Sequence, residues 1–309
     1  MSAPVIDVKD LSKSFGTQTV LKNLNFQVGK GEVYSLLGMN GAGKTTVIKI
    51  LTTLSHKDAG EAYVAGFDVE QEPRSVEEAI SLTGQFTAVD ELFTAQENLV
   101  MIGRLRHLKD AKEAALALLE QFRLLDAKDQ LVASFSGGMK RRLDIAMSLI
   151  GNPQIIFLDE PTTGLDPKSR LEVWGLIRKL KEAGVTIFLT TQYIEEAEQL
   201  ADRVGILKEG RLIAEGTPKE LKDTVEENGV ELGFYTKNDY EKAVVLLAAY
   251  SIRENVEELN IQVLTNGSAK EFALVLGMLE TAGLELRAFS KIESRLEDVF
   301  LKIVEKGAA

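Results

Sequence analysis

The hydrophobic and polar positions along the chain follow strand-like patterns in some segments and helix-like patterns in others. Five short apolar runs have the composition and flanking turns of strands: residues 5–8, 24–28, 32–37, 155–159 and 185–190. The third run leads directly into GMNGAGKTT, after which apolar residues recur at helical spacing from Val47 to Leu54. Strands connected through helical sequence in this way predict a parallel sheet covered on its faces.

The segment from Thr94 to about Arg142 has a mostly helical pattern. Thr94 and Glu97 have the spacing of a capping box, and AKEAALALLEQF is an amphipathic run. We therefore expect a helical subdomain, at about residues 86–150, inserted into the first domain.

A second, smaller domain is predicted at the C-terminal end. The segment TPKE at residues 217–220 indicates the start of a helix, and the character of the chain changes after residues 226–229. Strand-like and helix-like segments then follow one another: GVELGFYT, a helix at residues 239–250, LNIQVLT, a helix at 269–281, LELRAFS and a helix from Arg295. The sequence thus predicts a large domain at residues 1–224 and a small α/β domain at residues 225–309.

Composition limits the class of protein. The chain has 309 residues, and 36 basic against 47 acidic side chains give a net charge of −11. An apolar content of 45% is that of a globular protein, and the acidic balance without a basic block argues against a nucleic-acid partner. The chain has no cysteine, which excludes thiolate chemistry, and His56 and His107 are too few for a histidine-built metal site.

No apolar stretch approaches the roughly 20 residues that cross a bilayer. The N-terminal segment MSAPVIDVKD contains acidic residues and lacks the continuous apolar core of a secretory signal. We therefore expect a soluble, cytoplasmic protein.

The segment from Gly38 to Thr45 matches a phosphate-binding loop, in which two glycines bracket four residues and are followed by lysine and threonine. Backbone N–H groups of such a loop face an anion at the start of a helix. In this motif Lys44 holds the β and γ phosphates and the hydroxyl of Thr45 binds Mg²⁺. A glycine-rich turn that only caps a helix is the alternative; the preceding strand and following helix favour nucleotide binding.

Two carboxylates, Asp159 and Glu160, end the apolar run IIFLD. The end of a strand in a parallel sheet faces the ligand crevice. Asp159 is therefore a candidate Mg²⁺ ligand, and Glu160 a candidate base for the water that attacks the γ phosphate. An acidic pair that merely ends a strand at the surface is the alternative, which the nearby phosphate loop disfavours.

Ser136, Gly137 and Gly138 open the helical run that continues with MKRR. A serine and two glycines at a helix start offer open backbone N–H groups to an anion. Alternatively, Ser136 is only an N-cap and the basic residues at 140–142 form a solvated face.

With these motifs in this order, the sequence resembles the ATP-binding subunits of ABC transporters. GMNGAGKTT is similar to the Walker A motif of that family, FSGGM to its signature, IIFLDE to its Walker B and GLD at residues 164–166 to its D-loop. The resemblance covers about residues 4–222. It implies an α/β fold: a P-loop ATPase core with an N-terminal antiparallel β subdomain and a helical insertion, to which the small C-terminal α/β domain is added.

The resemblance also implies roles for individual residues. Gln85 falls at the Q-loop glutamine that contacts Mg²⁺ and couples to the membrane subunit, Phe15 at the aromatic that stacks on adenine, and Val20 near the ribose. The residues implied to bind ATP are Phe15, Val20, Gly38, Asn40, Gly41, Ala42, Gly43, Lys44, Thr45, Thr46, Gln85, Ser136, Gly137, Gly138 and Asp166. Those implied to bind Mg²⁺ are Thr45, Gln85 and Asp159, and those implied in catalysis are Lys44, Glu160 and Gln192.

Gln192 departs from the family, because it stands where the resemblance places a switch histidine. Glutamine can donate a hydrogen bond to the γ phosphate, but it cannot hold a proton or a positive charge. We therefore expect slowed hydrolysis with ATP binding largely preserved.

The resemblance further implies a head-to-tail homodimer. One chain carries one phosphate loop and one signature site, which in this family lie too far apart in a monomer to bind the same ATP. Asp166, followed by Pro167, reads as a helix N-cap, and in the family it also crosses the dimer interface.

Three segments, GQFTAVDE, SGGMKRR and LEDVF at residues 296–300, resemble the daunorubicin-resistance type of drug-exporter ATPase. This implies a Mg²⁺-dependent ATPase that powers export of a drug, antibiotic or other hydrophobic compound through a separate membrane-spanning permease, on whose cytoplasmic face the protein would lie. A second hypothesis, which Gln192 slightly favours, is an ATP-binding regulatory or assembly switch that does not transport.

Phe86, Val89, Leu92 and Phe93 have two interpretations. They form either an exposed groove for a short helix of a membrane partner, or ordinary core.

The C-terminal domain offers no clustered polar set. Ser294 and Glu297 have capping-box spacing, so the LEDVF segment has a structural explanation as a helix start. A structural or dimer-strengthening role is favoured over ligand sensing.

Overall fold

The computed structural model describes residues 3–85, 87–224, 229–265, 267–292 and 295–306, and the side chains of that set up to residue 302. The chain divides into two compact units, Met1–Pro218 and Lys219–Ala309. Three predictions involve residues outside the described set. Phe86 is part of the possible docking groove, residues 225–228 follow the expected domain boundary, and Ser294 is one partner of the second capping box.

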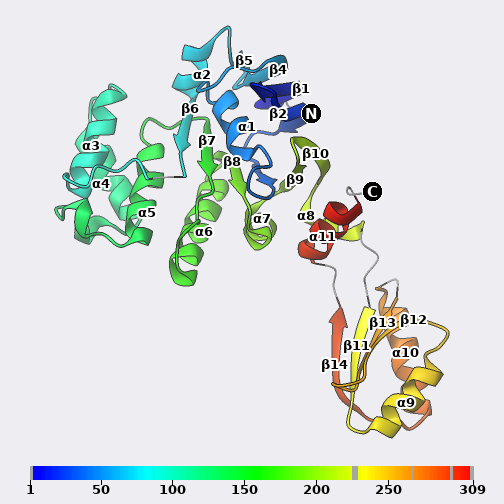
Figure 1. The fold of residues 1–309 in the computed structure, drawn as a ribbon. Helices are drawn as coiled ribbons and strands as arrows, with labels where there is room; N and C mark the ends of the chain where they lie inside the picture. The colour runs from blue at the N-terminus through cyan, green and yellow to red at the C-terminus, as the bar shows by residue number, and fades with distance from the viewer. Residues whose placement is uncertain (1–2, 86, 225–228, 266, 293–294, 307–309) are drawn as a thin grey trace. The chain divides into compact units, whose positions relative to one another are not determined.

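An antiparallel sheet at one side of the first unit has the strand order β2-β1-β4-β5 (Figure 1). Its strands are β1 (Ile6–Phe15), β2 (Gln18–Val28), β4 (Ala59–Val64) and β5 (Phe67–Asp68). β1 and β2 form a hairpin that turns at Gly16, whose φ of 60° is in the left-handed region that glycine adopts without strain. The hairpin extends well beyond the short runs expected from the sequence, because shifts of register between Val8 and Ser14 interrupt the alternation that sequence patterns detect.

The central sheet has the order β10-β9-β3-β8-β7-β6, in which only β10 is antiparallel to its neighbour. Its strands are β3 (Val33–Leu37), β6 (Ile80–Thr83), β7 (Ile155–Asp159), β8 (Thr186–Thr191), β9 (Arg203–Lys208) and β10 (Arg211–Gly216). β3, β7 and β8 are buried at every position, as expected for strands covered on both faces.

Alternate side chains of β7 enter two different cores. Ile155 and Phe157 pack with helix α1 (Lys44–Leu51) and with the antiparallel sheet. Ile156 and Leu158 face the opposite side, where helices cover the sheet. The helices of the first unit besides α1 are α2 (Pro73–Ala79), α3 (Ala95–Leu105), α4 (Ala111–Gln121), α5 (Gly137–Ser148), α6 (Pro167–Glu182) and α7 (Ile194–Leu200).

Helices α3, α4 and α5 lie together at the side of the unit away from the antiparallel sheet, which confirms a helical insertion (Figure 1). The capping box at the start of α3 is present, because the Thr94 hydroxyl accepts from the Glu97 N–H and the Glu97 carboxylate accepts from the Thr94 N–H. Two short 3-10 helices, Leu125–Ala127 and Val132–Ser134, connect α4 to α5.

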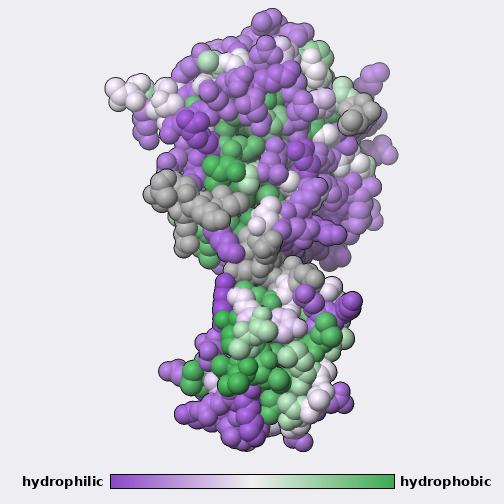
Figure 2. All heavy atoms as spheres, turned by 90° about the vertical axis from the view of Figure 1, so that its right-hand side faces the viewer, coloured by the Kyte–Doolittle hydropathy of each residue, from purple (hydrophilic) through white to green (hydrophobic). Residues whose placement is uncertain are grey.

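The second unit contains an antiparallel sheet of order β12-β13-β11-β14. Its elements are α8 (Pro218–Asp223), β11 (Gly229–Phe234), α9 (Lys237–Leu246), β12 (Ser251–Asn255), β13 (Asn260–Leu264), α10 (Ala269–Thr281), β14 (Leu286–Ile292) and α11 (Leu296–Lys306). Val230, Leu232 and Val263 pack with α9 and α10 in a core of its own. Figure 2 shows apolar side chains on the face of this unit where α9 and α10 lie, and Leu274 and Val245 are exposed there.

No helix of the described residues is long and apolar enough to span a membrane.

Candidate functional site

The glycine-rich loop lies where the sequence predicts it, between the end of β3 and the start of α1. Gly43 precedes α1 with a φ of 111°, and a Cβ there would lie 2.7 Å from Leu21 Cδ2, so both conformation and space require glycine. The Gly38 N–H donates to the Thr191 carbonyl at 3.1 Å. This bond joins the loop to the end of β8, the strand that precedes Gln192.

Lys44 is buried at the first position of α1. Its Nζ donates to the carbonyls of Gly38 and Met39 at 2.8 and 3.2 Å, and it lies 3.2 Å from Glu160 Oε1. The ammonium group is thereby held inside the loop, beside the second carboxylate of the acidic pair. A cation in this position suits the phosphates of a nucleotide.

Asp159 ends β7 and is buried. Its Oδ1 accepts a hydrogen bond from the Thr190 hydroxyl at 2.5 Å and lies 3.4 Å from the Thr45 hydroxyl. Mg²⁺ binds through one or two protein oxygens together with phosphate and water oxygens, rather than in a cage of carboxylates. The hydroxyl and carboxylate brought together here fit such an ion.

Glu160 follows Asp159 with a φ of 47°, a left-handed conformation that costs energy in a residue with a side chain. Its N–H donates to the Thr190 carbonyl and hydroxyl, both at 3.1 Å, and its Oε2 accepts from the Thr163 hydroxyl at 3.1 Å. These contacts aim the carboxylate at Lys44, where the phosphates of a nucleotide would lie. This geometry would suit a base beside a phosphate site.

Gln192 is half-buried directly after β8. The helix that follows it, α7, carries the buried carboxylate of Glu196, which accepts from the Thr162 hydroxyl at 2.7 Å and from Trp174 Nε1 at 3.0 Å. Burial raises the pKa of Glu196. The segment after Gln192 is therefore bonded to the segment after Glu160.

The signature segment opens α5, and Ser136 is its N-cap: the Ser136 hydroxyl accepts from the Met139 N–H at 3.2 Å. A Cβ on Gly138 would lie 2.5 Å from the Ser169 hydroxyl. Asp166 caps α6, accepting from the Ser169 N–H and hydroxyl at 3.0 and 2.6 Å, and these bonds lower the pKa of Asp166. The signature and the D-loop thus meet at Ser169.

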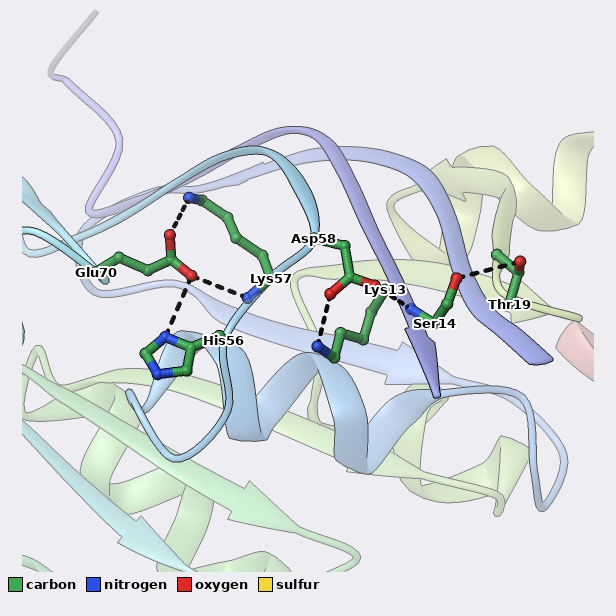
Figure 3. Close-up of polar contacts among 7 residues, drawn as sticks. All are labelled: Lys13, Ser14, Thr19, His56, Lys57, Asp58 and Glu70. Atoms are coloured by element: carbon green, nitrogen blue, oxygen red, sulfur yellow. Dashed lines mark hydrogen bonds and ion pairs between the residues drawn. The ribbon is translucent and has the colours of Figure 1, made fainter. Parts of the chain in front are cut away.

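Phe15 stands at the tip of the β1–β2 hairpin with 54% of its surface exposed. The Lys13 Nζ lies 5.3 Å from the centre of the Phe15 ring. It also donates to Asp58 Oδ1 at 2.7 Å, and the Ser14 N–H donates to Asp58 Oδ2 at 2.6 Å (Figure 3). These two hydrogen bonds lower the pKa of Asp58, and the bond from Lys13 contributes more than the bond from Ser14. A neighbouring carboxylate, Glu70, contacts His56 and Lys57 in the same way (Figure 3).

Gln85 is exposed, two residues beyond the end of β6. Of the possible docking residues that can be described, Val89 packs against the core, whereas Leu92 is 82% exposed. Phe93 is partly exposed at the rim of a groove of about 670 Å³ along α3. The core interpretation therefore applies to Val89, whereas Leu92 and Phe93 remain available for docking.

The structure brings Lys44, Thr45, Asp159 and Glu160 together beyond the ends of β3 and β7, which flank β8 in the central sheet. Val20 lies beside the phosphate loop, because its carbonyl is 3.2 Å from the position that a Cβ on Gly43 would take. Among the residues that the structure describes, no hydrogen bond or ion pair joins the signature segment 136–138 to the phosphate loop. Asn40, Gly41, Ala42 and Thr46 lie within the loop or the first turn of α1.

Several residues of the site were not singled out from the sequence. The Thr190 hydroxyl donates to the Asp159 carboxylate and accepts from the Glu160 N–H, but its only signal was its place at the end of an apolar strand. Arg141 is buried with Asp144 under the acidic pair, so the solvated-face interpretation of the basic run fails for this residue. Lys140, in contrast, is near the surface and pairs with Glu91.

A glycine loop between a central parallel strand and a helix, a buried lysine, and a hydroxyl and two carboxylates at the neighbouring strand ends define a P-loop ATPase. The family model described as ABC transporter matches residues 21–163. The chain belongs to the ATP-binding proteins of ABC transporters, as the following relatives show.

Two relatives match over nearly their whole length. The daunorubicin/doxorubicin resistance ATP-binding protein DrrA of Streptomyces peucetius is 43% identical over 303 residues, which cover 96% of this chain and 92% of that protein. The Nod factor export ATP-binding protein I of Rhizobium sp. (strain N33) is 39% identical over 306 residues, 98% of each chain. The similarity to both relatives thus extends into the C-terminal unit.

Solved structures match about 70% of the chain. The ATP-binding subunit of an ABC transporter is 30% identical with a TM-score of 0.64, covering 71% of this chain and 92% of that chain. A dimeric ATP-binding cassette bound to ADP and Pi in a post-hydrolysis state is 28% identical with a TM-score of 0.62, covering 69% of this chain and 98% of that chain.

Proposed function

We propose that this protein is the ATP-hydrolysing subunit of an exporter whose membrane-spanning permease is a separate chain. Its membership of the ABC ATPases of resistance and export systems implies ATP binding and hydrolysis. The observation that carries the proposal is the convergence of Lys44, Thr45, Asp159 and Glu160 on one edge of the central sheet.

The residues divide the chemistry among them. Lys44 and the loop amides bind the phosphates, and Thr45, Asp159 and Gln85 are the residues that would hold Mg²⁺. Bound Mg²⁺ supplies charge neutralisation on the phosphate oxygens. Glu160 accepts the proton of the attacking water, and its contacts to Thr163 and Lys44 fix the carboxylate for that step.

Hydrolysis in this protein is slowed by Gln192. An imidazole at this position can carry a positive charge toward the γ phosphate, whereas a neutral amide offers only a hydrogen bond. ATP binding rests on Lys44 and the loop amides, which Gln192 does not replace.

ATP binds between two copies of the chain arranged head to tail. The phosphate loop and the signature segment 136–138 are unconnected within the part of one chain that can be described, and each presents a helix start suited to phosphate. Phe15 stacks on adenine, and Asp166, next to the signature through Ser169, reaches the facing chain. Closing of this dimer on ATP delivers the work, and hydrolysis reopens it.

The permease docks on the groove along α3. Its apolar lining residues are Phe93, Val100, Met101 and Leu105, and its polar ones are Gln96, Glu97, Arg104 and Lys112. A lining of this mixed character suits one face of an amphipathic partner helix. Docking there would hold the protein at the cytoplasmic face of the membrane, close to Gln85. The relatives are named for daunorubicin/doxorubicin resistance and Nod factor export, which supports a drug, antibiotic or other hydrophobic compound as the cargo.

An efflux measurement tests this proposal. Cells would express the chain with the membrane protein encoded in the adjacent reading frame, and the retention of fluorescent doxorubicin would be followed. We expect lower retention than in cells that express the pair with Lys44→Ala. Retention that is equal in both, combined with ATP hydrolysis by the purified protein, would favour the alternative, a regulatory or assembly switch that Gln192 makes slow.

A further inference from the structure

A buried arginine of the signature helix α5 contacts the backbone on both sides of Glu160. Arg141 Nε donates to the Pro161 carbonyl at 2.7 Å, and its Nη2 lies 3.4 Å from the Asp159 carbonyl. The side chain is only 3% exposed. A guanidinium group has five N–H donors in a rigid fork, so one side chain can bind several carbonyls at fixed positions.

The same guanidinium reaches the loop that carries Gln85. Arg141 Nη1 donates to the Gly84 carbonyl at 2.8 Å and to Asp144 Oδ2 at 3.1 Å. The other oxygen of Asp144 accepts from the Ala88 N–H at 3.2 Å. The pair Arg141–Asp144 therefore holds the chain on both sides of Gln85 and on both sides of Glu160.

Glu160 needs such support. Its φ of 47° is a strained conformation for a residue with a side chain, and such conformations persist only where surrounding contacts enforce them. Thr190 fixes the N–H of Glu160, and Arg141 fixes the carbonyls before and after it. Displacement of α5 would shift these carbonyls and with them the direction of the carboxylate.

We propose that Arg141, with Asp144, is a positioning residue that holds Glu160 in its catalytic conformation and makes it respond to movement of the Gln85 loop. The inference rests on the proposed function, in which Glu160 is the base and Gln85 lies toward the membrane partner. The buried ion pair thus links the surface that meets the permease to the step that hydrolyses ATP.

The test compares Arg141→Lys with Arg106→Lys. Lysine keeps the charge that Asp144 needs but cannot span the carbonyls of three residues. Arg106 is the matched control because its guanidinium donates to the Ile80 carbonyl, at the opposite end of β6. Asp144→Asn, which keeps an acceptor for the Ala88 N–H, is the second variant if Arg141→Lys does not fold.

Two readouts separate positioning from stability. Steady-state kinetics should show kcat reduced by about tenfold or more in Arg141→Lys, with KM and the Kd of a fluorescent ATP analogue within about twofold of wild type. Hydrogen exchange should be faster in the peptides that contain Gly84, Ala88 and residues 155–165. Arg106→Lys should change neither the kcat nor the exchange of residues 155–165.

Each outcome decides one claim. Unchanged exchange in the peptides around Gly84 and Glu160 would overturn the positioning role, whether or not the wild type hydrolyses ATP. Unchanged kcat in Arg141→Lys, with turnover by the wild type, would also overturn it. Absence of turnover in the wild type, with faster exchange in the variant, would instead refute the hydrolytic function and leave the structural link intact.

Discussion

At the scale of single residues, the candidate site is a set of hydroxyl, carboxylate and ammonium groups that hold one another in place. Asp159 and Glu160 both depend on Thr190, and Lys44 lies between the loop carbonyls and Glu160. The sequence motifs identified Lys44, Asp159 and Glu160 because their spacing is fixed by backbone geometry. They could not identify Thr190, because a bond across two strands leaves no local spacing to detect.

The prediction at Gln192 concerns rate rather than binding. Replacing Gln192 with His should raise kcat by about threefold or more, because an imidazole can carry positive charge toward the γ phosphate. The Kd for ATP should stay within about twofold, and steady-state kinetics with a binding titration would measure both. Gln192→Asn, which keeps an amide but shortens the side chain, is the control and should not raise kcat. A Gln192→His enzyme with unchanged or lower kcat would refute the prediction.

At the scale of elements, the sequence predicted the strands and helices whose patterns are regular. Strand β7 and helix α10 have strong periodicity and were placed well; helix α10 coincides with residues 269–281. Strands β9 and β10 were not singled out, although Glu209 and Gly210, both with positive φ, form the tight turn between them. Strand β12 is exposed and polar, so no apolar alternation marks it.

The stability contributed by the contacts of the Phe15 hairpin should depend on pH, because Asp58 titrates. The pKa of Asp58 is lowered in the folded protein, so its stabilising contribution is present above the unfolded pKa of about 4 and is lost as the pH falls through the folded value. Asp58→Asn should therefore melt at a lower temperature than wild type at pH 7, and the gap should narrow toward about pH 3. Lys13→Met, which removes the partner, should show the same trend. A gap that stays constant with pH would contradict this account.

The capping box of α3 should contribute to the stability of the helical subdomain. Thr94→Ala removes the hydroxyl that accepts from the Glu97 N–H, at a cost of about 1 kcal/mol in the free energy of unfolding. Thr94→Ser keeps the hydroxyl and should lose much less. Chemical denaturation would measure both, and equal losses in the two variants would exclude a capping contribution.

At the scale of the whole molecule, the chain combines an ATPase unit with a small α/β unit. The sequence placed the boundary after residue 224, and the contacts divide the chain between Pro218 and Lys219. The order of the motifs indicated the fold of the first unit, because each motif marks either the end of a strand or the start of a helix. The pairing of strands in the second unit could not be predicted, because the order β12-β13-β11-β14 depends on long-range contacts.

Dimerisation should require ATP in the hydrolysis-deficient protein. Glu160→Gln with Mg²⁺ and ATP should elute as a dimer in size-exclusion chromatography with light scattering, because the bound nucleotide joins the phosphate loop of one copy to the signature of another. The double variant Lys44→Ala, Glu160→Gln should remain monomeric under the same conditions. A dimer of equal abundance without ATP would show that other surfaces hold the copies together.

The central claim is that Glu160 serves as the base of an ATPase, and one measurement tests it directly. Steady-state hydrolysis of ATP with Mg²⁺ would be compared between wild type and Glu160→Gln, with ATP binding measured in parallel. We predict turnover by the wild type and a loss of about a hundredfold or more in the variant, with the Kd for ATP within about twofold. Equal turnover in the two proteins, or none in a wild type that binds ATP, would contradict the account.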